Sequence, residues 1–136
     1  MRTIPRVACL LALAAGLAAG APAAGAHSGE ELGGEVATQS NGERAVGYGR
    51  FTTTRRHYRL HVRVCVQRWQ GGKRWVTKGC ARGSAKKAKT RTRSVDVPCS
   101  RDGLYRVRVW GYTKSSSGKR GHQVSGKSPG YGIDCA

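Results

Sequence analysis

Acidic residues are scarce in this chain, and they become scarcer along it. The 136 residues contain seven Asp and Glu against 25 Lys and Arg, and after Glu43 only Asp96, Asp102 and Asp134 remain. General acid–base catalysis usually needs carboxylates or histidines held in a pocket. Asp102 precedes a glycine in an expected turn and Asp134 adjoins the last cysteine, so Asp96 alone is uncommitted. Because glycoside hydrolysis needs two facing carboxylates, this shortage argues against a glycosidase.

Other signatures of catalytic and metal sites are missing as well. The chain has no phosphate-cradling glycine loop, no cluster of metal ligands and no Cys-x-x-Cys pair, so we predict neither a metal nor a cofactor. The remaining enzymatic hypothesis is a secreted ribonuclease that uses two of His57, His61 and His122 with a nearby lysine. We expect instead that these histidines lie on a solvated sheet face and that the protein is not an enzyme.

Long hydrophobic runs are limited to the N-terminus. Arg2 and Arg6 precede the apolar segment 7–24, and Ala24-Gly25-Ala26 has the small-x-small pattern of a cleavage site. The segment is short and rich in Ala and Gly for a membrane-spanning helix. We therefore predict a signal peptide over 1–26, secretion of the remainder, and no transmembrane segment after cleavage.

Four cysteines remain after that cleavage, and an even number in a small exported chain indicates disulfides. If residues 71–74 form a four-residue hairpin loop, Cys65 lies directly opposite Cys80, where a bridge is feasible. We therefore expect Cys65 to pair with Cys80, which leaves Cys99 to pair with Cys135.

Alternation of apolar and polar residues marks two strong strands, Tyr58–Trp69 and Leu104–Tyr112. A shorter strand is expected over Ala45–Phe51, followed by a connector over 52–56. Residues 81–89 read as a loop that becomes an edge strand from Thr90. With five to seven strands and no helix expected, the fold class is all-β. A small disulfide-stapled β-sandwich is favoured, and a small β-barrel is the alternative.

The composition divides the chain into a short acidic part and a long basic part. Residues 27–43 are rich in Gly, Ser and Glu, with no Lys or Arg, and predict a flexible acidic arm. Residues 44–136 form the expected β-sandwich domain, with 23 basic residues against three acids. A field of this sign attracts polyanions and speeds association with them.

The second strong strand carries a resemblance. Asp102-Gly103-x-Tyr105-x-Val107-x-Val109-x-Gly111 resembles the strand-opening pattern of many bacterial immunoglobulin-like sandwiches. The resemblance implies that fold, with the Tyr105 ring closing a corner between the sheets. The whole chain is also similar to small secreted proteins of the actinobacterial type, mostly of unknown function.

The basic residues suggest where a polyanion would bind. The densest run is residues 86–93, which contains no acid and would project several cations from one side of a straight strand. Arginines that alternate along the two strong strands supply further rows, one of them flanked by Trp110 and Tyr112. The predicted polyanion-binding residues are Lys86, Lys87, Lys89, Arg91, Arg93, Arg59, Arg63, Arg106 and Arg108.

These observations predict a secreted cationic protein that binds an anionic polymer or surface by electrostatics. Cell-wall teichoic acid, nucleic acid and anionic lipid are all candidate ligands, because charge alone does not separate them. A secreted protease inhibitor or adhesion module, with a protein partner, is one alternative. The histidine-dependent ribonuclease is the other.

Overall fold

The computed structural model describes residues 30–39 and 41–136, and these residues contain β-strands and no helix. The predicted signal peptide and residues 27–29 of the predicted arm lie outside them. No helix in the described part is long and apolar enough to span a membrane. The strands are β1 (Glu30–Thr38), β2 (Arg44–Trp69), β3 (Trp75–Pro98), β4 (Gly103–Lys114), β5 (Arg120–Lys127) and β6 (Tyr131–Ile133).

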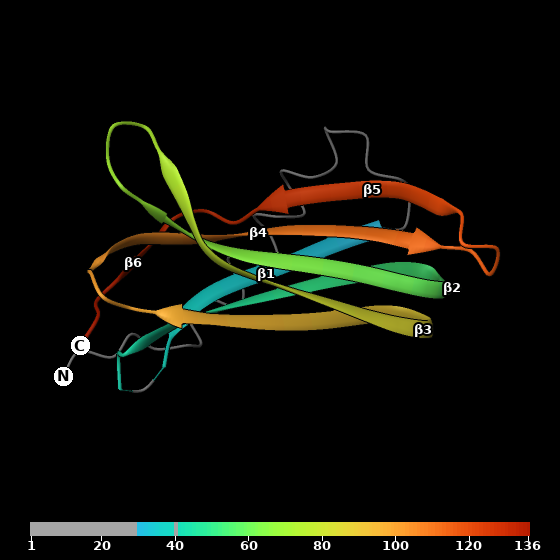
Figure 1. Ribbon diagram of the computed structural model, residues 1–136, viewed down its shortest axis with the longest axis horizontal. Helices are drawn as coiled ribbons and strands as arrows, with labels where there is room; N and C mark the ends of the chain where they lie inside the picture. The colour runs from blue at the N-terminus through green and yellow to red at the C-terminus, as the bar shows by residue number, and fades with distance from the viewer. Residues whose placement is uncertain (1–29, 40) are drawn as a thin grey trace.

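Two long strands build both layers of the molecule. Residues 44–53 of β2 pair with β1 on one side and with residues 90–98 of β3 on the other. After a register shift between Thr52 and His57, residues 59–68 of β2 pair with the first half of β3 and with β4. Strands β5 and β6 extend this second layer through β4. Figure 1 shows β5, β4, β2 and β3 running side by side, with the β2–β3 hairpin projecting at one end.

The two layers enclose one apolar core. Leu60, Val64, Val66 and Val109 of the second layer and Phe51 of the first are fully buried. Glycines let the layers approach closely. A Cβ atom added to Gly47 would lie 2.5 Å from a methyl group of Val66, and one added to Gly111 would lie 2.4 Å from the Phe51 ring.

The predicted fold class, an all-β sandwich with two disulfides, is confirmed. Its two layers belong to one curled six-stranded sheet, because β2 and β3 run through both. Within the described residues β1 and β3 pair only with β2, and β5 pairs only with β4. The sheet is therefore open at these edges and does not close into the alternative barrel.

The predicted flexible arm is wrong for residues 30–38, which form β1. Leu32 and Val36 are its only large apolar residues, and they are 3% and 0% exposed. They lie opposite Phe51 and Gly47 on the inner side of the layer. Because an edge strand buries only one face, two apolar side chains with intervening glycines are enough to hold it.

The predicted connector 52–56 and loop 81–89 are also wrong, since both belong to strands. The inner positions of β3 carry small residues, Ala81, Gly83 and Ala85, which face a crowded interior and leave no apolar signal. Pairing with β2 supplies the backbone hydrogen bonds that hold this half of β3 extended.

Both predicted disulfides are confirmed. Cys65 and Cys80 are directly opposed, with Cα atoms 4.1 Å apart, and Cys99 and Cys135 have Cα atoms 5.4 Å apart. The hairpin reaches this register differently from the prediction. Trp69 rather than Gln70 faces Trp75, and a bulge between Val66 and Gln67 restores the expected alignment at the cysteines.

Tyr105 occupies the corner that the resemblance implied for it. Its side chain is 1% exposed, and its hydroxyl donates a hydrogen bond of 2.8 Å to the carbonyl oxygen of Arg101, four residues upstream. Burial, partly offset by Arg68, raises the pKa of this hydroxyl. The bond fixes the start of β4 and the turn that precedes it.

Candidate functional site

The outer surface of the second layer is the most distinctive surface of the protein. Positions on β2 and β4 that alternate with the buried valines point outward, and the strand pairing aligns them with outward positions of β3 and β5. We call this surface the basic face. Its nine cations are Arg59, Arg63, Lys86, Arg82, Arg106, Arg108, Lys114, Arg120 and Lys127.

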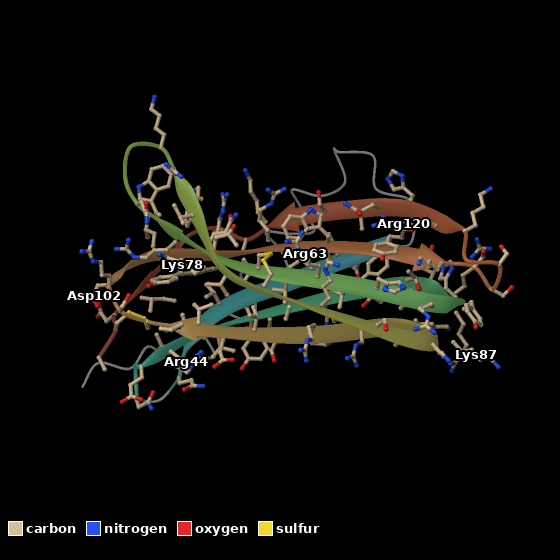
Figure 2. All side chains as sticks on the ribbon, viewed as in Figure 1. Arg44, Arg63, Lys78, Lys87, Asp102 and Arg120 are labelled. Atoms are coloured by element: carbon tan, nitrogen blue, oxygen red, sulfur yellow. A yellow bond between two sulfur atoms is a disulfide. The ribbon has the colours of Figure 1, made fainter. Side chains whose placement is uncertain are left out.

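None of the seven acidic residues lies on the basic face. Glu30, Glu31 and Glu35 are on β1, and Asp96 is on the half of β3 that belongs to the first layer, where it pairs with Arg44. Glu43, Asp102 and Asp134 lie outside the strands. Figure 2 places Arg63 and Arg120 over β2, β4 and β5, away from Arg44 and Asp102. The strand segments of the second layer thus carry no acidic residue, and the basic face has no internal counter-charge.

Tyr112 of β4 stands between its two neighbouring strands on this face. His61 of β2 stacks on its ring, with ring centroids 4.6 Å apart and the planes inclined by 6°. Arg120 of β5 places its guanidinium 3.8 Å from the same centroid and donates a hydrogen bond to Gln123. Since β4 lies between β2 and β5, the two neighbours approach the tyrosine from opposite sides.

The tryptophans of the basic face are covered in a similar way. The guanidiniums of Arg63 and Arg108 lie 5.0 and 4.7 Å from the Trp110 ring. Arg106 lies 4.2 Å from the Trp75 ring and donates a hydrogen bond of 2.8 Å to the side-chain oxygen of Gln67. Trp69 packs tilted against Trp75 at 5.3 Å. Such contacts hold arginines in fixed positions. They cost less free energy than burying an arginine together with a carboxylate would.

The surroundings of His61 on the basic face favour its neutral imidazole. Desolvation lowers its pKa below the ordinary 6.5, and the positive charges of Lys114, Arg59 and Arg120 lower it further. Its Nε2 has no hydrogen-bond partner in the described part of the protein. A neutral imidazole avoids adding charge repulsion where it stacks on Tyr112.

A shallow hollow of about 310 Å³ opens in the middle of the basic face. Three arginines from three strands line it, Arg63, Arg82 and Arg120. The other lining residues are Val62, His61, Trp110, Tyr112 and Gln123. The lining is therefore strongly positive, with no carboxylate, and suits a ligand that brings its own negative charge.

Five of the predicted binding residues lie together on this face: Arg59, Arg63, Lys86, Arg106 and Arg108. The predicted one-sided ribbon of Lys87, Lys89, Arg91 and Arg93 is wrong. Lys87 has a left-handed backbone, with φ of 49°, where β3 turns from one layer to the other. Beyond that turn Arg91 and Arg93 pack against Gly83, at the edge of the layer interface. They line a second hollow with His61 and Arg82, at the margin of the basic face.

The prediction missed four cations of the face. Lys114 continues the alternation of Arg106 and Arg108, and Arg82 is two residues from the correctly placed Cys80, so strand periodicity could have identified both. Arg120 and Lys127 belong to β5, whose only fully buried side chain is Val124. With so little apolar periodicity, no sequence signal showed which way β5 faces.

We expected no Gly-x-Ser-x-Gly nucleophile motif, but residues 126–130 have that spacing, with Ser128 at the centre. That spacing occurs at catalytic serines on strand-to-helix turns. Here the serine is buried, with 4% of its surface exposed. Its hydroxyl accepts a hydrogen bond from the Val107 amide and donates one to the Pro129 carbonyl oxygen. The side chain thus fastens the segment after β5 to β4.

Comparisons add the following. No protein-family model matches the chain, and no curated protein matches it. The C-terminal domain of Wzt is similar in structure, at 8% identity and a TM-score of 0.44, over 79% of this chain and 81% of that one. A protein described as pT26-6p has a sequence identity of 11% and a TM-score of 0.49, over 75% of this chain and 22% of its own length. A strand-swapped CTLA-4 from the duckbill platypus has a sequence identity of 15% and a TM-score of 0.39, over 62% of this chain and 81% of its own length. Likenesses at this level carry no information about activity or ligand.

Proposed function

We propose that this protein is a secreted, non-enzymatic module that binds an anionic polymer through the basic face. The observation that supports the proposal is the segregation of charge, with nine cations and no acid on one face of one layer. A polymer lying across that face would exchange its condensed counterions for fixed lysines and arginines, and the released ions would drive binding. The predicted signal peptide and the two disulfides support an extracellular site of action.

Rigidity of the face favours this function. Two of its strands are joined by the Cys65–Cys80 disulfide, and the aromatic contacts hold four of its arginines in place. Ordering a long side chain on binding costs about 0.5–1.5 kcal/mol, so arginines that are already ordered lose less on contact with a ligand.

The test compares two variants with equal charge loss. In the face variant, the exposed Arg82, Arg120 and Lys127 are all replaced by Gln. In the control variant, Arg55, Arg74 and Arg101 are replaced by Gln; these are exposed and lie outside the face. Each loses three positive charges. At physiological salt we expect the face variant to bind heparin and single-stranded DNA about tenfold or more weakly, and the control variant to bind within about twofold of the unmodified protein.

Affinity is measured by fluorescence anisotropy with a labelled oligonucleotide, and thermal unfolding confirms that both variants keep the fold. Equal weakening in the two variants would mean that total charge, rather than the basic face, determines binding. Absence of binding by the unmodified protein at low salt would reject the proposed function altogether.

A further inference from the structure

The aromatic rings of the basic face are positioned as supports for cations. Tyr112 has His61 on one side and the Arg120 guanidinium on the other. The Trp110 ring has two guanidiniums over it, at 4.7 and 5.0 Å. Trp75 carries Arg106 on its ring, at 4.2 Å, and packs against Trp69 as well. A flat ligand group such as a nucleobase would have to displace these neighbours before it could stack.

The same contacts leave the arginines ready to bind oxyanions. A guanidinium that stacks on a ring uses its flat surface, and its N–H donors still point outward around its edge. Those donors form a planar fork that matches two oxygens of one phosphate group. The ring therefore orients the arginine and leaves its hydrogen-bonding capacity for a ligand.

Three arginines line the central hollow, and its lining contains no carboxylate that could compete with a ligand for them. They are Arg63, Arg82 and Arg120. Arg63 donates a hydrogen bond to the Cys80 sulfur and Arg120 donates one to the side-chain oxygen of Gln123, and both acceptors are uncharged. Arg63 Nε has no hydrogen-bond partner within the described residues. A phosphate group at this position would meet donors from β2, β3 and β5 together.

We propose that the basic face binds a phosphodiester polymer through its backbone oxyanions alone and takes no part of its affinity from stacking on bases. The inference rests on the proposed function and narrows it to a ligand class. A polymer of phosphodiesters binds whether or not its repeating unit carries a base, so base-free polyol phosphates and nucleic acids share the chemistry that is recognised. Proteins that hold single strands by stacking gain about 1–3 kcal/mol per base, and that gain is missing here.

The test uses two oligomers with the same number of phosphates and the unmodified full-length secreted protein. One is a 12-residue oligothymidylate, and the other is a 12-residue oligomer of abasic tetrahydrofuran units with the same phosphodiester backbone. Their dissociation constants are measured at equal low salt by competition against a labelled probe. We expect the two constants to agree within about twofold, because the contacts are with phosphates alone.

Tenfold or weaker binding of the abasic oligomer would overturn the inference, since even one stacked base contributes about that much. Failure of both oligomers to bind would instead reject the proposed function. A second measurement uses Trp110→Leu, which removes a support for two arginines and keeps every charge. Equal weakening for both oligomers is expected, and weakening confined to the thymidylate would show that Trp110 stacks on bases.

Discussion

Raising the sodium chloride concentration from 50 to 200 mM is expected to weaken binding of a single-stranded polyanion by about 300-fold. The figure assumes that six of the nine cations each contact one phosphate, at a slope of about −0.7 per contact in a plot of log K against log salt. The basic face supplies these contacts without internal acids, so no intramolecular ion pair competes with the ligand.

The face variant sharpens this prediction. Replacement of Arg82, Arg120 and Lys127 removes three contacts, so the salt slope should become shallower by about two. Replacement of Arg55, Arg74 and Arg101 should leave the slope unchanged. Binding constants measured by anisotropy at five salt concentrations give both slopes. Salt-independent binding would contradict the electrostatic account and favour a partner that recognises shape.

Gly111→Ala is expected to destabilise the protein by about 3 kcal/mol, the upper end of the cost of overpacking a core. The new Cβ would lie 2.4 Å from the nearest ring atom of Phe51, which is fully buried. The surrounding residues of both layers are also buried, so the ring can move aside only if the core repacks. Thermal and chemical unfolding measure the change.

Gly132→Ala is the control, because an added Cβ there meets nothing within 4 Å. Its stability should change by less than about 0.5 kcal/mol, as is usual for surface substitutions. The double variant Phe51→Leu/Gly111→Ala should be more stable than the sum of the single effects, since removal of the ring makes room for the methyl group. Strictly additive effects would contradict the close approach of the two layers.

Much of the fold could be predicted because two strands are clearly patterned. Tyr58–Trp69 and Leu104–Tyr112 alternate apolar and polar residues, and this pattern located the core of the second layer and its outward arginines. Strand pairing also placed Cys65 opposite Cys80, although the predicted loop was one residue too short. An error in loop length was compensated by a bulge, which no sequence pattern specified.

The rest could not be predicted because periodicity disappears where small residues are buried. The inner positions of β3 hold Gly79, Ala81 and Gly83, which resemble loop residues in composition. The run 86–93 appeared one-sided because a period of two assumes a straight strand, whereas the backbone turns at Lys87. Cations of β5 could be assigned to the face only from its pairing with β4.

The most direct measurement is a chemical footprint of the arginines with and without a bound oligonucleotide. Phenylglyoxal modifies accessible arginines, and mass spectrometry reports the extent of modification at each position. The account predicts that the ligand protects Arg82 and Arg120, which are exposed on the basic face, and leaves Arg55 and Arg101 as reactive as before. Uniform protection of all four arginines, or protection of Arg55 and Arg101 alone, would contradict it.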